Sequence, residues 1–135
     1  MRTAAAMPFS SLKDYLRQLE EATAEIELPV RILEEKIARL RDGGFALWLL
    51  GNGGSLAVAQ HFAQDLVKRC GVRAFCVNDP SIITAYANDH AFEYSFYSAL
   101  QVWRQPGDAV LIFSCSGKSR NYIEFVSQEL NPLYA

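Results

Sequence analysis

The sequence has few of the residues that mark a disulfide-rich, nucleic-acid-binding or membrane-spanning protein. Its 135 residues include three cysteines and two histidines, and 13 basic residues stand against 15 acidic ones. Cys70, Cys76 and Cys115 are odd in number and lack C-x-x-C spacing, so we expect reduced thiols in a cytoplasmic protein. The interspersed charges form no basic stripe, which argues against nucleic acid as a partner. No apolar run approaches the ~20 residues of a membrane span.

What the chain does have is a large apolar fraction. Half of its residues are hydrophobic, which is enough for the core of one domain. The first residues lack the long apolar segment of a secretory signal, so we expect no membrane association and no export.

Residues 1–43 are predicted to form two helices. Apolar residues recur at spacings of three and four on either side of Pro29, which predicts one helix over 9–27 and a second over 30–41. Ser10 or Ser11 is a candidate N-cap of the first. These helices either cover the core or pair with another subunit. Their apolar positions are Leu12, Tyr15, Leu16, Leu19, Ala22, Ile26, Ile32, Leu33, Ile37 and Leu40.

Residues 44–135 are predicted to form an α/β domain. Short apolar runs at 45–50, 72–77 and 109–113 predict strands buried on both faces, as in a parallel sheet. Helical periodicity between them, with a break near Asn88-Asp89, gives an alternating β-α-β-α-β order with right-handed crossovers. A final helix is expected after Ser119. The third strand is expected to form a sheet edge.

Two Gly/Ser loops follow the first and third strands, and a helix follows each loop. They are Gly51-Asn52-Gly53-Gly54-Ser55 and Ser114-Cys115-Ser116-Gly117-Lys118-Ser119. Glycine lets the backbone approach a ligand closely, and a helix N-terminus offers unpaired N–H groups to a phosphate. In a sheet of order 2-1-3 the two loops flank the switch point where ligands bind. Each loop taken alone is compatible with a plain tight turn, but together they predict one shared phosphate site.

Two other phosphate motifs fit worse. The P-loop pattern has Ile112 where its first glycine belongs, and the dinucleotide fingerprint has Leu56 in place of its third glycine.

The segments "GNGGSLAVAQHFAQDLVKR", "ITAYANDHAFE" and "PGDAVLIFSCSGKS" resemble the sugar isomerase (SIS) domain family, and within it the phosphoheptose isomerases. The resemblance implies a flavodoxin-like three-layer α/β fold with a parallel sheet. It also implies a homotetramer and aldose–ketose isomerisation of sedoheptulose 7-phosphate. Members of the family continue with two further strands and a helix carrying a His and a Gln. This chain is therefore expected to be an incomplete, C-terminally truncated form.

The same resemblance assigns the substrate-binding residues. Cys115 stands where the family has Thr or Ser, and a thiol is a weaker hydrogen-bond donor. Lys118 replaces a usual Asn and either adds charge to the site or points into solvent. Asp89 either contacts sugar hydroxyls or belongs to a turn that ends a helix. The expected substrate-binding set is Asn52, Gly53, Ser55, Asp89, Ser114, Cys115, Ser116 and Ser119.

His61 and Asp65 are four residues apart and share one helix face. The resemblance implies that Asp65 is the acid/base that moves a proton between C1 and C2. It also implies that His61 and Asp65 bind a metal such as zinc in some members. Asp65 stands where the family has Glu, one methylene longer, and His61 and Asp65 also fit a plain solvated pair. Two ligands are fewer than the three or four that a zinc site needs.

Helix geometry raises a distance problem for Asp65. Ten helical residues separate it from Ser55, or roughly 15 Å at ~1.5 Å per residue. We therefore expect a neighbouring subunit to complete the site. The alternative function is a non-catalytic module that binds a sugar phosphate or regulates a partner, which the shorter Asp65 and the missing C-terminal His favour.

Overall fold

The structure is a computed structural model that describes residues 10–130. These residues divide into two compact units, one ending at Lys36 and the other beginning at Ile37. The first unit is the larger part of helix α1 (Leu12–Asp42). The second contains the last turns of that helix, a sheet and the remaining helices.

The prediction of two N-terminal helices is wrong, because α1 runs without interruption through Pro29. Proline removes one helical hydrogen bond and costs about 3 kcal/mol in a helix interior. An ion pair between Arg31 and Glu27, 2.8 Å long, spans the proline, and strong helix formers flank it on both sides. At the start of the helix, the Asp14 N–H donates to Ser11 Oγ at 3.1 Å, so Ser11 is the N-cap.

The three predicted segments form the strands of the sheet, and the strands lie in the predicted order. Its strands are β1 (Ala46–Gly51), β2 (Arg73–Cys76) and β3 (Ala109–Phe113). They are parallel and lie in the order β2-β1-β3. Gly51 is opposite Phe113 in the register, so β1 and β3 end at the same level. The prediction that β3 forms a sheet edge is confirmed within the described residues.

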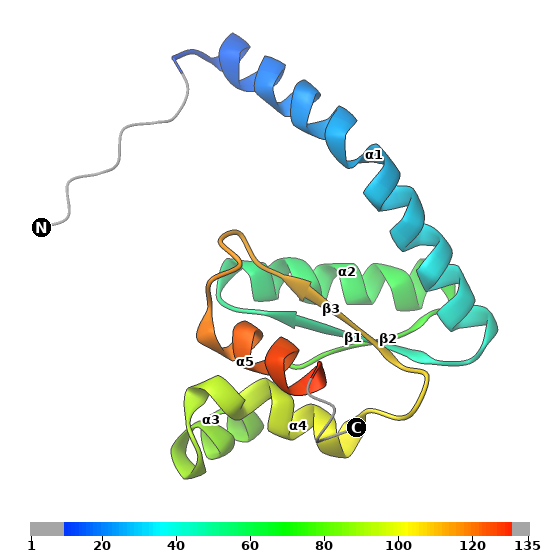
Figure 1. Ribbon diagram of the computed structural model, residues 1–135. Helices are drawn as coiled ribbons and strands as arrows, with labels where there is room; N and C mark the ends of the chain where they lie inside the picture. The colour runs from blue at the N-terminus through cyan, green and yellow to red at the C-terminus, as the bar shows by residue number, and fades with distance from the viewer. Residues whose placement is uncertain (1–9, 131–135) are drawn as a thin grey trace, which may run out of the picture. The chain divides into compact units, whose positions relative to one another are not determined.

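Helices cover both faces of the sheet (Figure 1). On one face lies α2 (Gly54–Cys70). On the other lie α3 (Pro80–Asp89), α4 (Ser95–Trp103) and α5 (Arg120–Glu129), with a short 3-10 turn, η1 (Phe92–Tyr94), between α3 and α4. This is the expected three-layer α/β arrangement. The break in the helical region falls directly after Asp89, at the predicted position.

The core lies on both sides of β1, whose residues alternate between the faces. Leu50 packs with Phe96, Leu100 and Phe125 on the side of α3, α4 and α5. Leu49 is fully buried and points to the α2 side by alternation. Fully burying a leucine contributes about 1.5–3 kcal/mol, so these two residues fix β1, and with it the loop that follows.

Asp108 joins β1 and β3 at the end of the sheet opposite the two Gly/Ser loops. Its carboxylate accepts from the Ala46 N–H at 2.8 Å, the Trp48 indole N–H at 3.0 Å and the Gln105 N–H at 3.1 Å. Partial burial alone would raise the pKa of Asp108, but these three hydrogen bonds and the charge of Arg73 outweigh it and lower the pKa.

Cys70, Cys76 and Cys115 are free, as predicted, and burial raises the pKa of the Cys76 thiol. Within residues 10–130, no helix combines the length and the apolar character needed to cross a bilayer.

Candidate functional site

The two Gly/Ser loops meet at the carboxyl ends of β1 and β3 (Figure 1). A reciprocal pair of side-chain amides joins the first loop to the first turn of α5, the helix that follows the second loop. Asn52 Nδ2 donates to Asn121 Oδ1 at 3.0 Å, and Asn121 Nδ2 donates to Asn52 Oδ1 at 3.0 Å. Asn52 follows β1 directly, and Asn121 is the second residue of α5. The structure therefore brings together two loops that the sequence separates by about sixty residues.

The first loop depends on glycine at two positions. A Cβ on Gly51 would lie 2.5 Å from the backbone of both Ser55 and Leu56, so only glycine lets the first turn of α2 pack this closely on β1. Gly53, the N-cap of α2, has φ 54° and ψ −123°, a backbone region that is essentially restricted to glycine. No side chain caps the N-terminus of α2. The N–H groups of Ser55 and Leu56 donate to the carbonyls of Asn52 and Gly53, at 3.1 and 3.0 Å, so the N–H groups that this end offers to a ligand are those of Gly53 and Gly54.

The second loop is organised by its own serines. Ser114 Oγ accepts from the Gly117 N–H at 3.0 Å, and Ser116 Oγ accepts from the Lys118 N–H at 3.3 Å. Each hydroxyl keeps its own hydrogen for donation to an anion. Ser119 is the N-cap of α5, yet its side chain makes no capping bond. The side chains of Cys115 and Lys118 are exposed.

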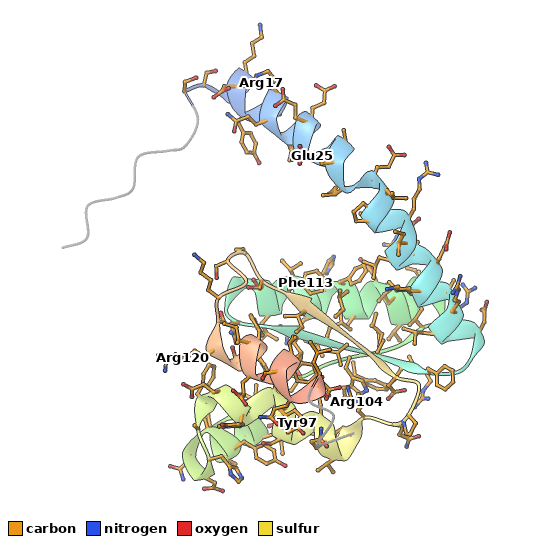
Figure 2. All side chains as sticks on the ribbon, viewed as in Figure 1. Arg17, Glu25, Tyr97, Arg104, Phe113 and Arg120 are labelled. Atoms are coloured by element: carbon orange, nitrogen blue, oxygen red, sulfur yellow. The ribbon has the colours of Figure 1, made fainter. Side chains whose placement is uncertain are left out.

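The electrostatics of the two helix N-termini favour an anion. Each helix N-terminus carries partial positive charge, and neither α2 nor α5 has an acidic residue in its first turn. Arg120 projects outward at the start of α5 (Figure 2) and pairs with Glu93 of η1 at 3.3 Å. A hydrogen bond from its own backbone, and then one from Arg120, lower the pKa of Glu93.

His61 and Asp65 lie further along α2, away from its N-terminus. Their side chains are 3.5 Å apart, and Asp65 also pairs with Arg69 at 3.3 Å. Asp65 remains partly exposed, with 38% of its side-chain surface accessible. Phe62 packs edge-on against Phe113, the last residue of β3, with ring centroids 5.8 Å apart. The middle of α2 therefore lies against the end of β3, while the carboxylate itself is held by neighbours on its own helix.

Asp89 lies at the end of α3 and is exposed. Its carboxylate accepts a hydrogen bond from Asn88 Nδ2 at 3.0 Å. The segment after it is tied to the second loop, because Glu93 pairs with Arg120. Asp89 is thus a helix-end residue on a segment that adjoins the loop region.

Sequence reasoning missed Asn121 and Tyr122. Asn121 is fully buried, and Tyr122 is 5% exposed. The ring of Tyr122 stacks on Phe96 with centroids 5.9 Å apart. Burial raises the pKa of the Tyr122 hydroxyl, and the nearby backbone of Asn52 partly offsets this, although the hydroxyl makes no full hydrogen bond among the described residues. One signal was available: Asn121 is a polar residue on the inward face of an amphipathic helix, and such a residue needs a partner.

The described residues do not by themselves fit a zinc ion. Across residues 10–130, no three His, Cys, Asp or Glu side chains come together as a set of metal ligands. His61 and Asp65 supply two ligands, and a zinc site needs at least three from the protein.

The fold is a three-layer α/β domain with two Gly/Ser loops at one end of a parallel sheet. A family model described as SIS domain matches residues 9–129, and the chain belongs to this family.

The relatives of the chain within this family are phosphoheptose isomerases. It is 40% identical over 116 residues to the phosphoheptose isomerase of Trichlorobacter lovleyi, covering 82% of this chain and 59% of the relative. It is 41% identical to that of Geobacter sulfurreducens, covering 80% and 61%. The solved phosphoheptose isomerase of Neisseria gonorrhoeae aligns with a TM-score of 0.77 and 31% identity, over 83% of this chain and 61% of that one. The chain thus spans about three fifths of the length of these relatives.

Proposed function

We propose that this chain carries the sugar-phosphate site of a phosphoheptose isomerase, which converts sedoheptulose 7-phosphate into the aldose heptose 7-phosphate. The observation that carries the proposal is the amide pair between Asn52 and Asn121, which holds two uncapped helix N-termini at one end of the sheet. Similarity to phosphoheptose isomerases supports the substrate class.

In the proposed complex the phosphate lies between the two loops. N–H groups at the start of α2 and α5 donate to its oxygens, and the serine hydroxyls add further donors. Asp89 accepts hydrogen bonds from sugar hydroxyls, and Lys118, which is exposed in the second loop, adds positive charge. The proposed contacts are Asn52, Gly53, Ser55, Ser114, Cys115, Ser116 and Ser119.

The proposed reaction is a proton transfer between neighbouring carbons. Asp65 removes a proton from C1 of the ketose, the electron pair of the broken C–H bond forms the C1–C2 double bond, and the C2 carbonyl oxygen takes the carbonyl π electrons and a proton to give an enediol. Return of the proton from Asp65 to C2, with loss of the proton on O1 and re-formation of the carbonyl at C1, gives the aldose. The base must lie within hydrogen-bond reach of the proton that it takes. Asp65 is one methylene shorter than glutamate, so the rate depends on how closely its carboxylate reaches the proton on C1.

Incubation of the chain with sedoheptulose 7-phosphate tests the function. We expect formation of the aldose product, together with a rise in the melting temperature, because a ligand that binds the folded state stabilises it. A raised melting temperature without product would instead identify a non-catalytic sugar-phosphate-binding module. An unchanged melting temperature at millimolar ligand would refute binding altogether.

We further propose that the chain assembles with copies of itself, up to a homotetramer, through α1. The helix carries apolar residues at alternating spacings of three and four, the pattern of a helix-packing seam. Before Lys36 none of these residues is buried; Leu16, Leu19 and Ile26, for example, are about half exposed. An apolar stripe of this length favours a partner helix of the same kind. Further positions of the stripe are Leu12, Val30 and Leu33.

Asp65 is too far from the loops of its own subunit to reach a sugar phosphate that they hold. A site shared between two subunits would bring Asp65 of one subunit close to the loops of the other. We expect that mixing a Ser55→Ala subunit with an Asp65→Ala subunit restores isomerase activity that neither has alone. The mixed oligomer then holds one site with intact loops from one subunit and Asp65 from the other. The measurement is activity after joint unfolding and refolding of the two variants.

The matched control is a mixture of Ser55→Ala with Ser116→Ala. Both changes damage the loops, so no combination of subunits restores a complete site, and activity should stay at the level of the separate variants. Failure of the first mixture to exceed this control would rule out the shared site.

The proposal also includes a zinc ion and a cytoplasmic location. Zinc at His61 and Asp65 requires at least one further ligand from outside the described residues, so no step above is assigned to it. A cytoplasmic location is supported by the three free thiols, one of which, Cys115, is exposed in the second loop.

A further inference from the structure

Asn52 of the first loop and Asn121 of α5, the helix that follows the second loop, are joined by a reciprocal pair of side-chain hydrogen bonds. Each amide gives one N–H and accepts one, and both distances are 3.0 Å. The pair is self-complementary, since turning both amides over together restores the same two bonds. Asn121 is fully buried, so water does not compete for its half of the pair.

The two residues are anchored unequally. Asn121 lies in the first turn of α5, beside Tyr122, and that helix is fixed in the core by Tyr122 and Phe125. Asn52 lies in the first loop, between the end of β1 and the glycine that begins α2. Gly53 and Gly54 have open space where a side chain would be, so little packing restrains this loop on its outer side. The amide pair therefore transmits the rigid position of α5 to the loop.

The amide pair also holds the two helix N-termini together against their electrostatic repulsion. Two helix N-termini that face one site carry partial charges of the same sign, and these repel until an anion arrives. Without a tether, part of the binding energy of the ligand is spent on drawing the loops together. A tether that sets their spacing in advance removes that cost, which is the general advantage of preorganisation.

We propose that Asn121 is a positioning residue for anion binding: it acts through Asn52 to hold the two loops at the spacing that a phosphate group requires. The inference rests on the proposed function, because it assigns the geometry of the same phosphate site. Asn121 itself is too deeply buried to contact the ligand.

The test compares affinity with stability in the full chain. The probe is sedoheptulose 7-phosphate, with affinity measured by calorimetry and stability by urea unfolding. We expect Asn121→Ala to weaken binding about tenfold, a loss equivalent to one or two hydrogen bonds. The matched control is Ser95→Ala. Ser95 is equally buried and donates one hydrogen bond, to the Phe92 carbonyl at 2.8 Å, which involves neither loop residues nor Asn121. It should lose stability and keep its affinity.

A double-mutant comparison shows whether Asn121 acts through Asn52. In an Asn52→Ala background, adding Asn121→Ala should cost no further affinity, because the tether is already broken. An Asn121→Asp variant gives a second measurement in a side chain of nearly the same shape. Its protonated form can donate to Asn52 Oδ1, so affinity should improve as the pH falls toward the pKa of the new carboxyl group.

The outcomes separate the two proposals. If the unchanged chain binds no sugar phosphate, the proposed function fails. If it binds, and Asn121→Ala loses stability like Ser95→Ala while keeping full affinity, Asn121 is a structural residue only and the inference is overturned. An additive loss in the double variant also overturns it.

Discussion

Replacing Gly51 by alanine is expected to lower the free energy of unfolding by about 3 kcal/mol and to abolish sugar-phosphate binding. A Cβ at this position would lie 2.5 Å from backbone atoms of Ser55 and Leu56. Backbone atoms inside a helical turn cannot move aside as a flexible side chain does. The first turn of α2 must therefore shift away from β1 and out of line with the second loop. Urea unfolding and a thermal shift with ligand measure the two effects.

Gly54→Ala is the matched control for Gly51→Ala. Gly54 is the first residue of α2, and a Cβ added to it would have open space, with no heavy atom within 4 Å. Alanine is also a better helix former than glycine by about 1 kcal/mol. We expect Gly54→Ala to unfold at the same urea concentration as the unchanged chain, or at a higher one. Equal stability of the two alanine variants would show that the close contact at Gly51 is unimportant.

Replacing Asp108 by asparagine is expected to cost about 3 kcal/mol of stability at neutral pH. The carboxylate accepts three N–H groups, from Ala46, Trp48 and Gln105. An amide at the same place turns one acceptor into a donor that faces these N–H groups. Because the folded-state pKa of Asp108 is lowered, its contribution is present above the ordinary pKa of 3.8 and is lost as the pH falls through the folded-state value.

The unfolding free energy of the Asp108→Asn variant should therefore approach that of the unchanged chain in strong acid. Asp42→Asn is the control, since Asp42 is exposed and, within residues 10–130, forms an ion pair with the adjacent Arg41. It should shift stability by less than about 0.5 kcal/mol. A gap between the Asp108 variant and the unchanged chain that stays constant from pH 7 to pH 2 would contradict the assignment.

Local signals in the sequence predicted the sheet well. The run Ala109–Phe113 is the observed β3 without any change of bounds. The order of strands followed from the rule that apolar strands alternating with helices form parallel, right-handed crossovers. Buried strands are predictable in this way because both faces must be apolar, and the turns that bound them carry glycine, proline and aspartate.

One error concerns a local feature of the sequence, and the other concerns a long-range contact. Pro29 predicts a break by its own chemistry, yet α1 continues through it, and the exposed Glu27–Arg31 pair that spans it contributes only about 0.3–0.5 kcal/mol. The partner of Asn121 is 69 residues away in the sequence. A motif search finds loop residues by their glycines and serines, but a buried amide in the following helix shows its role only when the fold brings Asn52 to it.

The amide pair has a further consequence for how the site responds to its surroundings. Asparagine carries no net charge and does not titrate in water, so the tether between the loops is the same in acid and in base. An aspartate in either place would bring a negative charge next to an incoming dianion, and an arginine would bring a competing counter-ion. The hydrogen-bonded pair of Asn52 and Asn121 carries no charge at any pH. The pH profile of ligand capture should therefore follow the ionisation of the phosphate rather than that of the protein.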